Sequence, residues 1–277
     1  MDRQLILDIA NKLTAEEQGW DSALLPSTAQ IDAFVGTVRQ LVFLQTSGEA
    51  AAATLIAQAA RQLTLLVQST LGDGDEQQAA TTARRIVESL PELRQLLRSD
   101  VQAIADRDPA AESLNEVASC YPGATAMLHY RIAHALASLG LSLLPRIISE
   151  RAHSLTGIDI HPSATIGASF AIDHGTGIVI GATARIGHHV MLYQGVTLGA
   201  KRFEHDDSGR LLNGPRHPIV EDYVTIYSNT SVLGRITIGH HSVLGGNLWI
   251  THDVAPNSHV RQPKPIQHVG FIDGEGI

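Results

Sequence analysis

Aliphatic residues recur at every sixth position in the second half of the chain, and this period restricts the fold more than any other feature. Two runs share it: Ile160, Ile166, Ile172, Ile178, Ala184, Val190 and Val196, then Val220, Ile226, Val232, Ile238, Leu244 and Ile250. An amphipathic helix has an apolar period of about 3.6 residues and a half-buried strand a period of about 2, so neither produces this pattern. A six-residue period is typical of a parallel β-helix, in which stacked coils bury a continuous aliphatic column. The narrow interior of such a prism suits small and β-branched side chains, in agreement with an aromatic content of 4%.

The first 150 residues instead carry helical periodicity, with apolar residues three or four positions apart. We expect helices that begin near Ser27-Thr28 and that cover Ala52–Leu71, Glu76–Leu90 and Ala124–Leu139, with Gly72–Asp75 ending the second and Pro91 able to begin another. The chain is therefore predicted to be an α+β protein with three parts. They are an α-helical domain at residues 1–150, a β-helix at 151–262 with an extruded loop at 200–216, and a C-terminal tail at 263–277.

Composition and charge argue against several classes of partner. Asp and Glu number 28 against 20 Lys and Arg, so neither nucleic acid nor an anionic membrane is an expected partner. We find no apolar run that approaches a membrane span and no secretory signal pattern. The single cysteine, Cys120, excludes an internal disulfide and favours a cytoplasmic protein. We expect its thiol to be a buried, small apolar group.

Fourteen histidines raise the question of a metal site. Most are scattered or occur as adjacent pairs, such as His188-His189 and His240-His241, at expected coil corners. They have no cysteine partners and no helical H-x-x-x-H spacing, so we expect solvated surface residues and no metal.

Residues 200–216 interrupt the six-residue period with a polar, turn-forming sequence. Positions 202, 208 and 214 would continue the period but hold Arg, Ser and Gly. We therefore expect a loop that leaves the stack, and long loops on rigid scaffolds are usually functional. Arg216-His217 follows it directly.

Two polar pairs, Asp173-His174 and Arg216-His217, stand out against the aliphatic pattern, together with Asp159. With about eighteen residues per coil, Asp159 is expected roughly one coil from His174, where its carboxylate would orient the imidazole as a base. The planar guanidinium of Arg216 suits a carboxylate ligand. This set suits deprotonation of a small hydroxyl- or amine-bearing acid. Spacing alone does not separate this interpretation from polar residues that merely occupy coil corners.

Five motifs resemble those of the serine O-acetyltransferase family in order and spacing. They are Asp106-Arg-Asp108-Pro109-Ala, Asp159-Ile-His161-Pro162, Asp173-His174-Gly-Thr-Gly177, Gln194-Gly-Val-Thr-Leu-Gly199 and Arg216-His217-Pro218. The resemblance covers about residues 106–254 and the end of the chain, and the long N-terminus resembles the longer bacterial form. It implies a left-handed β-helix of the hexapeptide-repeat acyltransferase superfamily, although the repeat itself shows no handedness. It also implies transfer of acetyl from acetyl-CoA to the L-serine hydroxyl, giving O-acetyl-L-serine for cysteine biosynthesis.

The resemblance also implies roles for individual residues. His174 resembles the general base, Asp159 its orienting partner, and His217 a second imidazole that stabilises the oxyanion. Asp108, followed by Pro109, and Asp173 resemble the ligands of the substrate ammonium, and Arg216 that of its carboxylate. Acetyl-CoA, a co-substrate and not a permanently bound cofactor, is expected near Gly199, Ala200, Ser228 and Gly246.

The expected partners also follow from the resemblance. L-cysteine is expected as a feedback inhibitor, and a homotrimer or dimer of trimers as the assembly, with active sites between subunits. The chain ends in Asp273-Gly-Glu-Gly-Ile277, like family members whose terminal residue docks on O-acetylserine sulfhydrylase.

Three other functions are compatible with a β-helix. The first is a hexapeptide-repeat acetyltransferase with a different acceptor, such as a sugar, although a sugar offers Arg216 no carboxylate. The second is a γ-type carbonic anhydrase with zinc on His188, His189 and His217. The third is a non-catalytic scaffold that binds a partner through its tail.

Overall fold

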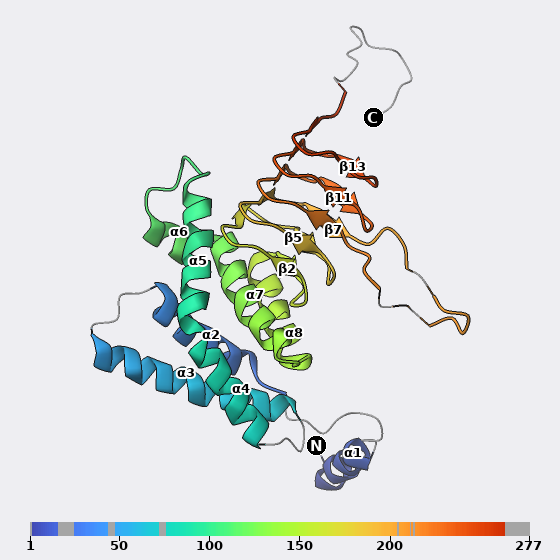
Figure 1. Cartoon of the computed structure of the whole chain (residues 1–277). Coiled ribbons are helices and arrows are strands. Elements are labelled where there is room, and N and C mark those ends of the chain that lie inside the picture. Colours follow the sequence, from blue (N-terminus) through green and yellow to red (C-terminus); the bar gives the residue numbers. More distant parts are fainter. Residues whose placement is uncertain are drawn as a thin grey trace.

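The computed structural model describes residues 2–15, 25–43, 48–71, 76–203, 205–210, 212 and 214–263. In these residues, a helical N-terminal part precedes a stack of short parallel strands (Figure 1). The helices are α1 (Arg3–Ala15), α2 (Thr28–Phe43), α3 (Glu49–Thr70), α4 (Glu76–Glu88), α5 (Leu90–Ala105), α6 (Leu114–Cys120), α7 (Pro122–Ser138) and α8 (Leu143–Thr156). The predicted α+β architecture is confirmed.

Four predicted helices correspond to α2, α3, α4 and α7, with ends that differ by up to three residues. The hydroxyl of Ser27 accepts the backbone N–H of Gln30, which caps α2 as expected. Pro91 lies in the first turn of α5. The predicted end of α3 at 72–75 lies outside the described residues.

Helices α1, α6 and α8 were not predicted. Helix α8 crosses the boundary placed after residue 150 and continues to Thr156. It ends at Gly157, whose φ of 69° lies in the left-handed region that glycine adopts without steric cost.

Among the described helices, α3 is long and apolar enough, by length and composition, to cross a membrane. This differs from the expectation that no apolar run approaches the length of a membrane span. One stripe of α3, including Leu63 and Val67, is buried, and the helix packs against α2 and α4. Helix packing thus accounts for this stripe, whereas Ile56 and Leu65 of the same helix are exposed.

The prediction that Cys120 is buried is wrong. Cys120 is exposed and is the last residue of the short helix α6. Val117 is the buried residue of that helix, because a helix of about two turns can direct only a narrow face inward.

The strands form three parallel sheets, which we call A, B and C, and the chain visits them in that order, except that the last described coil adds only an isolated bridge, Val254 to Ile238, beside sheet B. Sheet A contains β1 (Asp159–Ile160), β4 (Val179–Ile180), β7 (Thr197–Gly199), β10 (Ser231–Leu233) and β13 (Trp249–Ile250). Sheet B contains β2 (Thr165–Ile166), β5 (Arg185–Ile186), β8 (Ile219–Val220) and β11 (Thr237–Ile238). Sheet C contains β3 (Ala171–Asp173), β6 (Met191–Tyr193), β9 (Thr225–Ile226), β12 (Val243–Leu244) and β14 (His259–Val260). This is a parallel β-helix with three faces and three corners.

All of the residues at six-residue spacing are buried in the prism. The pairing nevertheless reveals a change of phase. Ile160 pairs with Ile180, 20 residues further on, whereas Ile180 pairs with Leu198, 18 residues further on. The first coil therefore holds two more residues than the expected eighteen, in the corner between β3 and β4. From Ile178 onward, the residues of the first six-residue run lie at buried corner positions. The buried residues of the strands now lie two positions later, beginning with Ile180.

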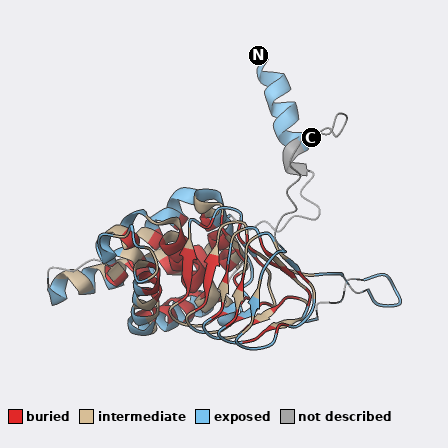
Figure 2. Ribbon diagram, turned by 90° about the horizontal axis from the view of Figure 1, so that it is seen from above, coloured by how far each residue is buried: buried red, intermediate tan, exposed pale blue. Residues whose placement is uncertain are grey.

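Most buried apolar residues form one large core through the helices and the coils (Figure 2), and a smaller cluster, which includes Val117 of α6 and Met191 of β6, lies apart from it. Helices α5 and α7 pack on β3, and α8 packs on β1. The hydroxyl of Tyr130 in α7 donates to the carbonyl of Ala164 in the first coil (2.7 Å). The helical part is thus joined to the first coil.

Candidate active site

The first polar group lies at the corner where sheet C leads into sheet A, which we call the C–A corner. Asp173 ends β3, and His174 follows with a φ of 56°, in the left-handed region. The two extra residues of the first coil belong to this corner. The His174 side chain is 74% exposed, and its Nδ1 lies 3.8 Å from Oδ1 of Asp173. That distance permits an ion pair but is too long for a hydrogen bond.

The helical domain contributes Asp108 to this group. Its Oδ2 accepts a hydrogen bond from the hydroxyl of Tyr121 (2.6 Å), and its Oδ1 accepts the N–H of Ala110 (2.8 Å). These bonds, with Tyr121 first, hold the pKa of Asp108 below its usual range, and His174 lowers it further. The same bond raises the pKa of Tyr121 to about 12. Asp108 is therefore a carboxylate near His174, and we name this set the His174 group: Asp108, Tyr121, Asp173 and His174. Pro109 is exposed beside Asp108.

The second group lies at the corner where sheet A leads into sheet B, the A–B corner. His217 is 7% exposed there, next to Arg216 at the return of the long loop. Its Nδ1 accepts the backbone N–H of Thr183 (3.1 Å) and lies 2.9 Å from the Thr183 hydroxyl. From the next coil, Arg235 donates to the carbonyls of Thr183 (2.7 Å) and His217 (3.0 Å). We name these residues, with His161, the His217 group.

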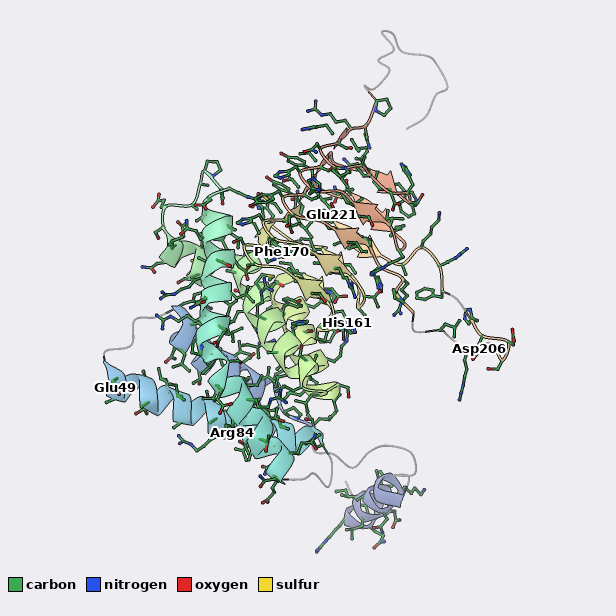
Figure 3. All side chains as sticks on the ribbon, in the orientation of Figure 1. Glu49, Arg84, His161, Phe170, Asp206 and Glu221 are labelled. Carbon is green, nitrogen blue, oxygen red and sulfur yellow. The ribbon has the colours of Figure 1, made fainter. Side chains whose placement is uncertain are left out.

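Burial and positive neighbours determine the charge of His217. Its burial first, and then Arg216, His161 and Arg235, lower the pKa of His217 to about 4. The imidazole is therefore neutral at neutral pH. His161, in the first coil (Figure 3), also has a lowered pKa, chiefly because of burial, although Asp159 opposes this shift.

Asp159 begins β1 in the same coil as His174. Within the described part of the chain, its carboxylate makes no hydrogen bond or ion pair, and it acts electrostatically on His161. The expected orientation of His174 by Asp159 stays a prediction.

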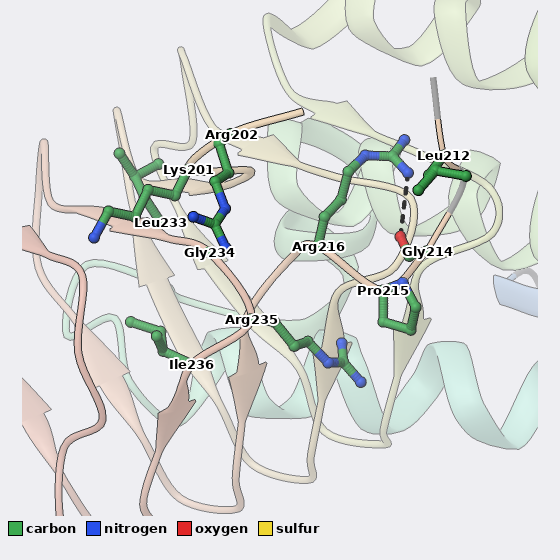
Figure 4. A pocket seen from close by; sticks show the side chains of 10 residues that line it. All are labelled: Lys201, Arg202, Leu212, Gly214, Pro215, Arg216, Leu233, Gly234, Arg235 and Ile236. Carbon is green, nitrogen blue, oxygen red and sulfur yellow. Dashed lines mark hydrogen bonds between the residues drawn. The ribbon is translucent and has the colours of Figure 1, made fainter. Parts of the chain in front are cut away.

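A cavity of about 320 Å³ opens between the base of the long loop and β10 (Figure 4). Its described lining contains Lys201, Arg202, Arg216 and Arg235 and no acidic residue. Arg216 donates a long hydrogen bond from its NH1 group to the carbonyl of Gly214 (3.4 Å), while its buried Nε has no partner among the described residues. The guanidinium groups of Arg216 and Arg235 and the ammonium of Lys201 give this lining positive charge, which favours an anion here. As expected, the loop leaves the stack, and Asp206 lies in its outer part (Figure 3).

The residues expected to contact acetyl-CoA are divided between the same two corners. Ser228 and Gly246 lie at the C–A corner in successive coils, and a Cβ on Gly246 would be 3.1 Å from the carbonyl oxygen of Ser228. Gly199 ends β7, and Ala200 follows it at the A–B corner beside the cavity.

The structure therefore brings together the predicted residues in two groups and not in one. Among the described residues, no hydrogen bond or ion pair joins the His174 group to the His217 group. The two corners flank sheet A, one at each end of its strands. His188 and His189 lie at the third corner, where the ring of His189 stacks on Tyr223 (4.7 Å). The histidines named for a carbonic anhydrase are thus on different corners.

Tyr121, Thr183 and Arg235 were missed by the sequence reading. Thr183 precedes His217 by 34 residues, the same offset that separates the paired residues Ile186 and Val220. The correct register across the loop would have placed Thr183 beside His217. No comparable signal identifies Tyr121, because its contact depends on how α6 and α7 pack.

Comparisons with known proteins agree with this architecture. Residues 41–139 match the family model "Serine acetyltransferase, N-terminal". A plasmid-encoded serine acetyltransferase of Synechococcus elongatus is 51% identical over 202 residues, which span 73% of this chain and 63% of that relative. The serine acetyltransferase of Bacillus subtilis is 44% identical over 159 residues, 57% of this chain and 70% of the relative. The structure of serine acetyltransferase 1 from Entamoeba histolytica with L-cysteine is 35% identical, with a TM-score of 0.76, over 94% of this chain and 98% of that one.

The chain has a helical N-terminal domain, a parallel β-helix with six-residue repeats, and polar groups at two corners. This combination defines a hexapeptide-repeat acyltransferase. Within that class, the family model, the two relatives and the solved structure named above are all serine acetyltransferases. The chain belongs to the serine acetyltransferase family.

Proposed function

We propose that this protein is a serine O-acetyltransferase that transfers acetyl from acetyl-CoA to the hydroxyl of L-serine. One observation supports the proposal: the corners beside sheet A hold polar groups that are chemically complementary to different parts of serine. One half has an exposed imidazole beside two carboxylates, and the other has Arg216, whose buried Nε has no partner in the part of the chain that the structure describes. Serine presents an ammonium for the carboxylates, a carboxylate for the guanidinium and a hydroxyl for the base.

The two halves would meet between subunits. In a homotrimer, alone or paired as a dimer of trimers, the C–A corner of one copy would face the A–B corner of the next. The outer face of sheet A supports this contact, because Val179 is 39% and Trp249 is 72% exposed in the single chain. Acetyl-CoA would occupy the same groove, beside Gly199 and Ala200 of one copy and Ser228 and Gly246 of the other.

The reaction follows from these positions. Asp108 and Asp173 bind the serine ammonium, and Arg216 binds its carboxylate. His174 takes the hydroxyl proton as the serine oxygen bonds to the thioester carbon, and the carbonyl π electrons move to oxygen. When the carbonyl re-forms, the C–S bond breaks and its electron pair stays on sulfur. His174 then returns the proton to the CoA thiolate, so protons and electrons balance.

A thiol-release assay tests the activity. Purified protein with acetyl-CoA should release free CoA with L-serine and much less with D-serine, L-homoserine or simple sugars. Faster release with a sugar would favour the different-acceptor function. Release of no thiol with any acceptor, by protein that is folded, would refute the proposal.

A mixing experiment tests the shared site. His174→Ala and Arg216→Ala subunits, each inactive alone, should regain about a quarter of wild-type activity after random reassembly, because one in four trimer interfaces joins two intact halves. A mixture of His174→Ala with His174→Asn subunits is the matched control and should stay inactive. If the first mixture also stays inactive although mixed trimers are detected, the site does not lie between subunits.

We also propose two partners and a location. L-cysteine carries the ammonium and carboxylate of serine and would compete for the same site, as feedback control of cysteine biosynthesis in the cytoplasm.

The terminal Ile277, which lies outside the described residues, would dock on O-acetylserine sulfhydrylase. A peptide ending in Asp-Gly-Glu-Gly-Ile should bind that enzyme, and removal of the final isoleucine should abolish binding. Equal binding by the shortened peptide would contradict docking without affecting the proposed activity.

A further inference from the structure

The hydrogen bonds around His217 determine which of its ring nitrogens carries the proton. A backbone N–H can only donate, and the N–H of Thr183 points at Nδ1 of His217 (3.1 Å). Nδ1 must therefore be an unprotonated acceptor. In a neutral imidazole the proton is then on Nε2, which makes no hydrogen bond within the described residues.

The hydroxyl of Thr183 reinforces this arrangement. Its oxygen accepts the backbone N–H groups of Arg216 (2.9 Å) and His217 (3.1 Å). Both lone pairs are thus occupied, and the hydroxyl hydrogen is left to be donated to Nδ1, 2.9 Å away. Thr183 therefore forms hydrogen bonds both to the backbone of Arg216 and His217, where the long loop rejoins the stack, and to the ring of His217.

Two further contacts limit the ring's movement. Arg235 holds the carbonyls of Thr183 and His217 from the next coil. On the other side, Gly181 lies so close that a Cβ there would be 2.1 Å from Cδ2 and Nε2 of His217. The ring is thus fixed in place as well as in tautomer.

We infer that Thr183 is a positioning residue that keeps the proton of His217 on Nε2, so that His217 acts as a neutral hydrogen-bond donor and not as a base. This rests on the proposed function, in which the donor would face the oxygen that gains negative charge when the thioester is attacked. A neutral donor keeps its proton throughout the reaction, which leaves His174 as the group that takes and returns the serine proton. The low pKa of His217 agrees with this role, because the ring does not titrate near neutral pH.

The tautomer is measured directly by nitrogen-15 NMR of the whole protein labelled at histidine, with His217→Asn to assign the signal. At neutral pH we expect a protonated Nε2, a bare Nδ1 and no titration between about pH 5.5 and 8, since the ring's pKa is about 4. A protonated Nδ1, or titration in that range, would overturn the inference. Because this measurement needs no substrate, it stands even if the protein does not acetylate serine.

Variants test the role in turnover. Thr183→Ser retains the hydroxyl and should stay within about threefold of wild-type kcat, whereas Thr183→Val retains the shape and should lose about 10–10²-fold, with a smaller change in KM for serine. At His217 itself, Gln places an amide N–H near the position of Nε2 and Asn near that of Nδ1. We expect His217→Gln to retain about tenfold more activity than His217→Asn. Equal activity in the two His217 variants, or full turnover in Thr183→Val, would contradict the inference.

Discussion

Asp100 of α5 and Arg131 of α7 pair with each other through two hydrogen bonds, each 3.0 Å long, and both side chains are almost entirely buried. Arg131 also donates to the carbonyls of Ile166 and Gly167, and Asp100 accepts the N–H of Phe170. Strand β2 has one strand neighbour, β5, so Arg131 covers part of its other edge. Every charge in this pair is therefore hydrogen-bonded at the point where the β-helix begins.

Arg131→Met should destabilise the protein by about 3–5 kcal/mol, because it leaves the Asp100 carboxylate buried without its cationic partner. The double variant Asp100→Leu/Arg131→Met should recover part of this loss, since it removes both charges. Urea unfolding measures both. A loss below about 1 kcal/mol in the single variant, as for exposed pairs, would contradict a stabilising role.

His174→Ala should lower kcat by about 10²–10⁴-fold, the usual contribution of a positioned general base. The fold should be unchanged, since the side chain is 74% exposed. Asp159→Asn should cost less, because water can partly replace an orienting carboxylate. Near-normal turnover by His174→Ala would assign the base elsewhere.

Arg216→Lys keeps the charge and loses the planar pair of donors, so KM for serine should rise much more than KM for acetyl-CoA. Inhibition by L-cysteine should weaken in parallel. Arg210→Lys, in the exposed part of the same loop, is the matched control and should alter neither constant. Cysteine inhibition that does not depend on Arg216 would place the amino-acid site elsewhere.

Tyr121→Phe should make serine binding more sensitive to acid. The hydrogen bond from Tyr121 lowers the pKa of Asp108, so the wild-type carboxylate stays ionised to a lower pH. Without the bond that pKa rises, and as pH falls KM for serine should begin to increase at a higher pH than in wild type. Tyr193→Phe is the control, because its hydroxyl makes no hydrogen bond among the described residues. Identical pH profiles of KM in Tyr121→Phe and wild type would show that the bond does not support substrate binding.

Gly181→Ala should reduce kcat while the protein stays folded, because the new Cβ would lie 2.1 Å from the His217 ring and must displace it. Gly214→Ala is a matched control at the same corner, since a Cβ there meets nothing within 4 Å. Crystal structures of both variants would show whether His217 moves. Full activity of Gly181→Ala with a displaced ring would remove His217 from the mechanism.

The sequence by itself determined the β-helix, the loop and the helical N-terminus, because side-chain periodicity follows directly from local geometry. Motif order and spacing, which are local features, also predicted Asp108, His174 and Arg216 as site residues. Only the tertiary structure revealed the two-residue change of phase after Ile172, which an aliphatic corner residue, Ile178, conceals in the sequence. Likewise, only the fold decided that the polar residues form two groups, at the two corners that flank sheet A. Tyr121 contacts Asp108, 13 positions away, and Thr183 contacts His217, 34 positions away. The first contact depends on helix packing and the second on coil register across the loop. No local sequence pattern encodes either of them.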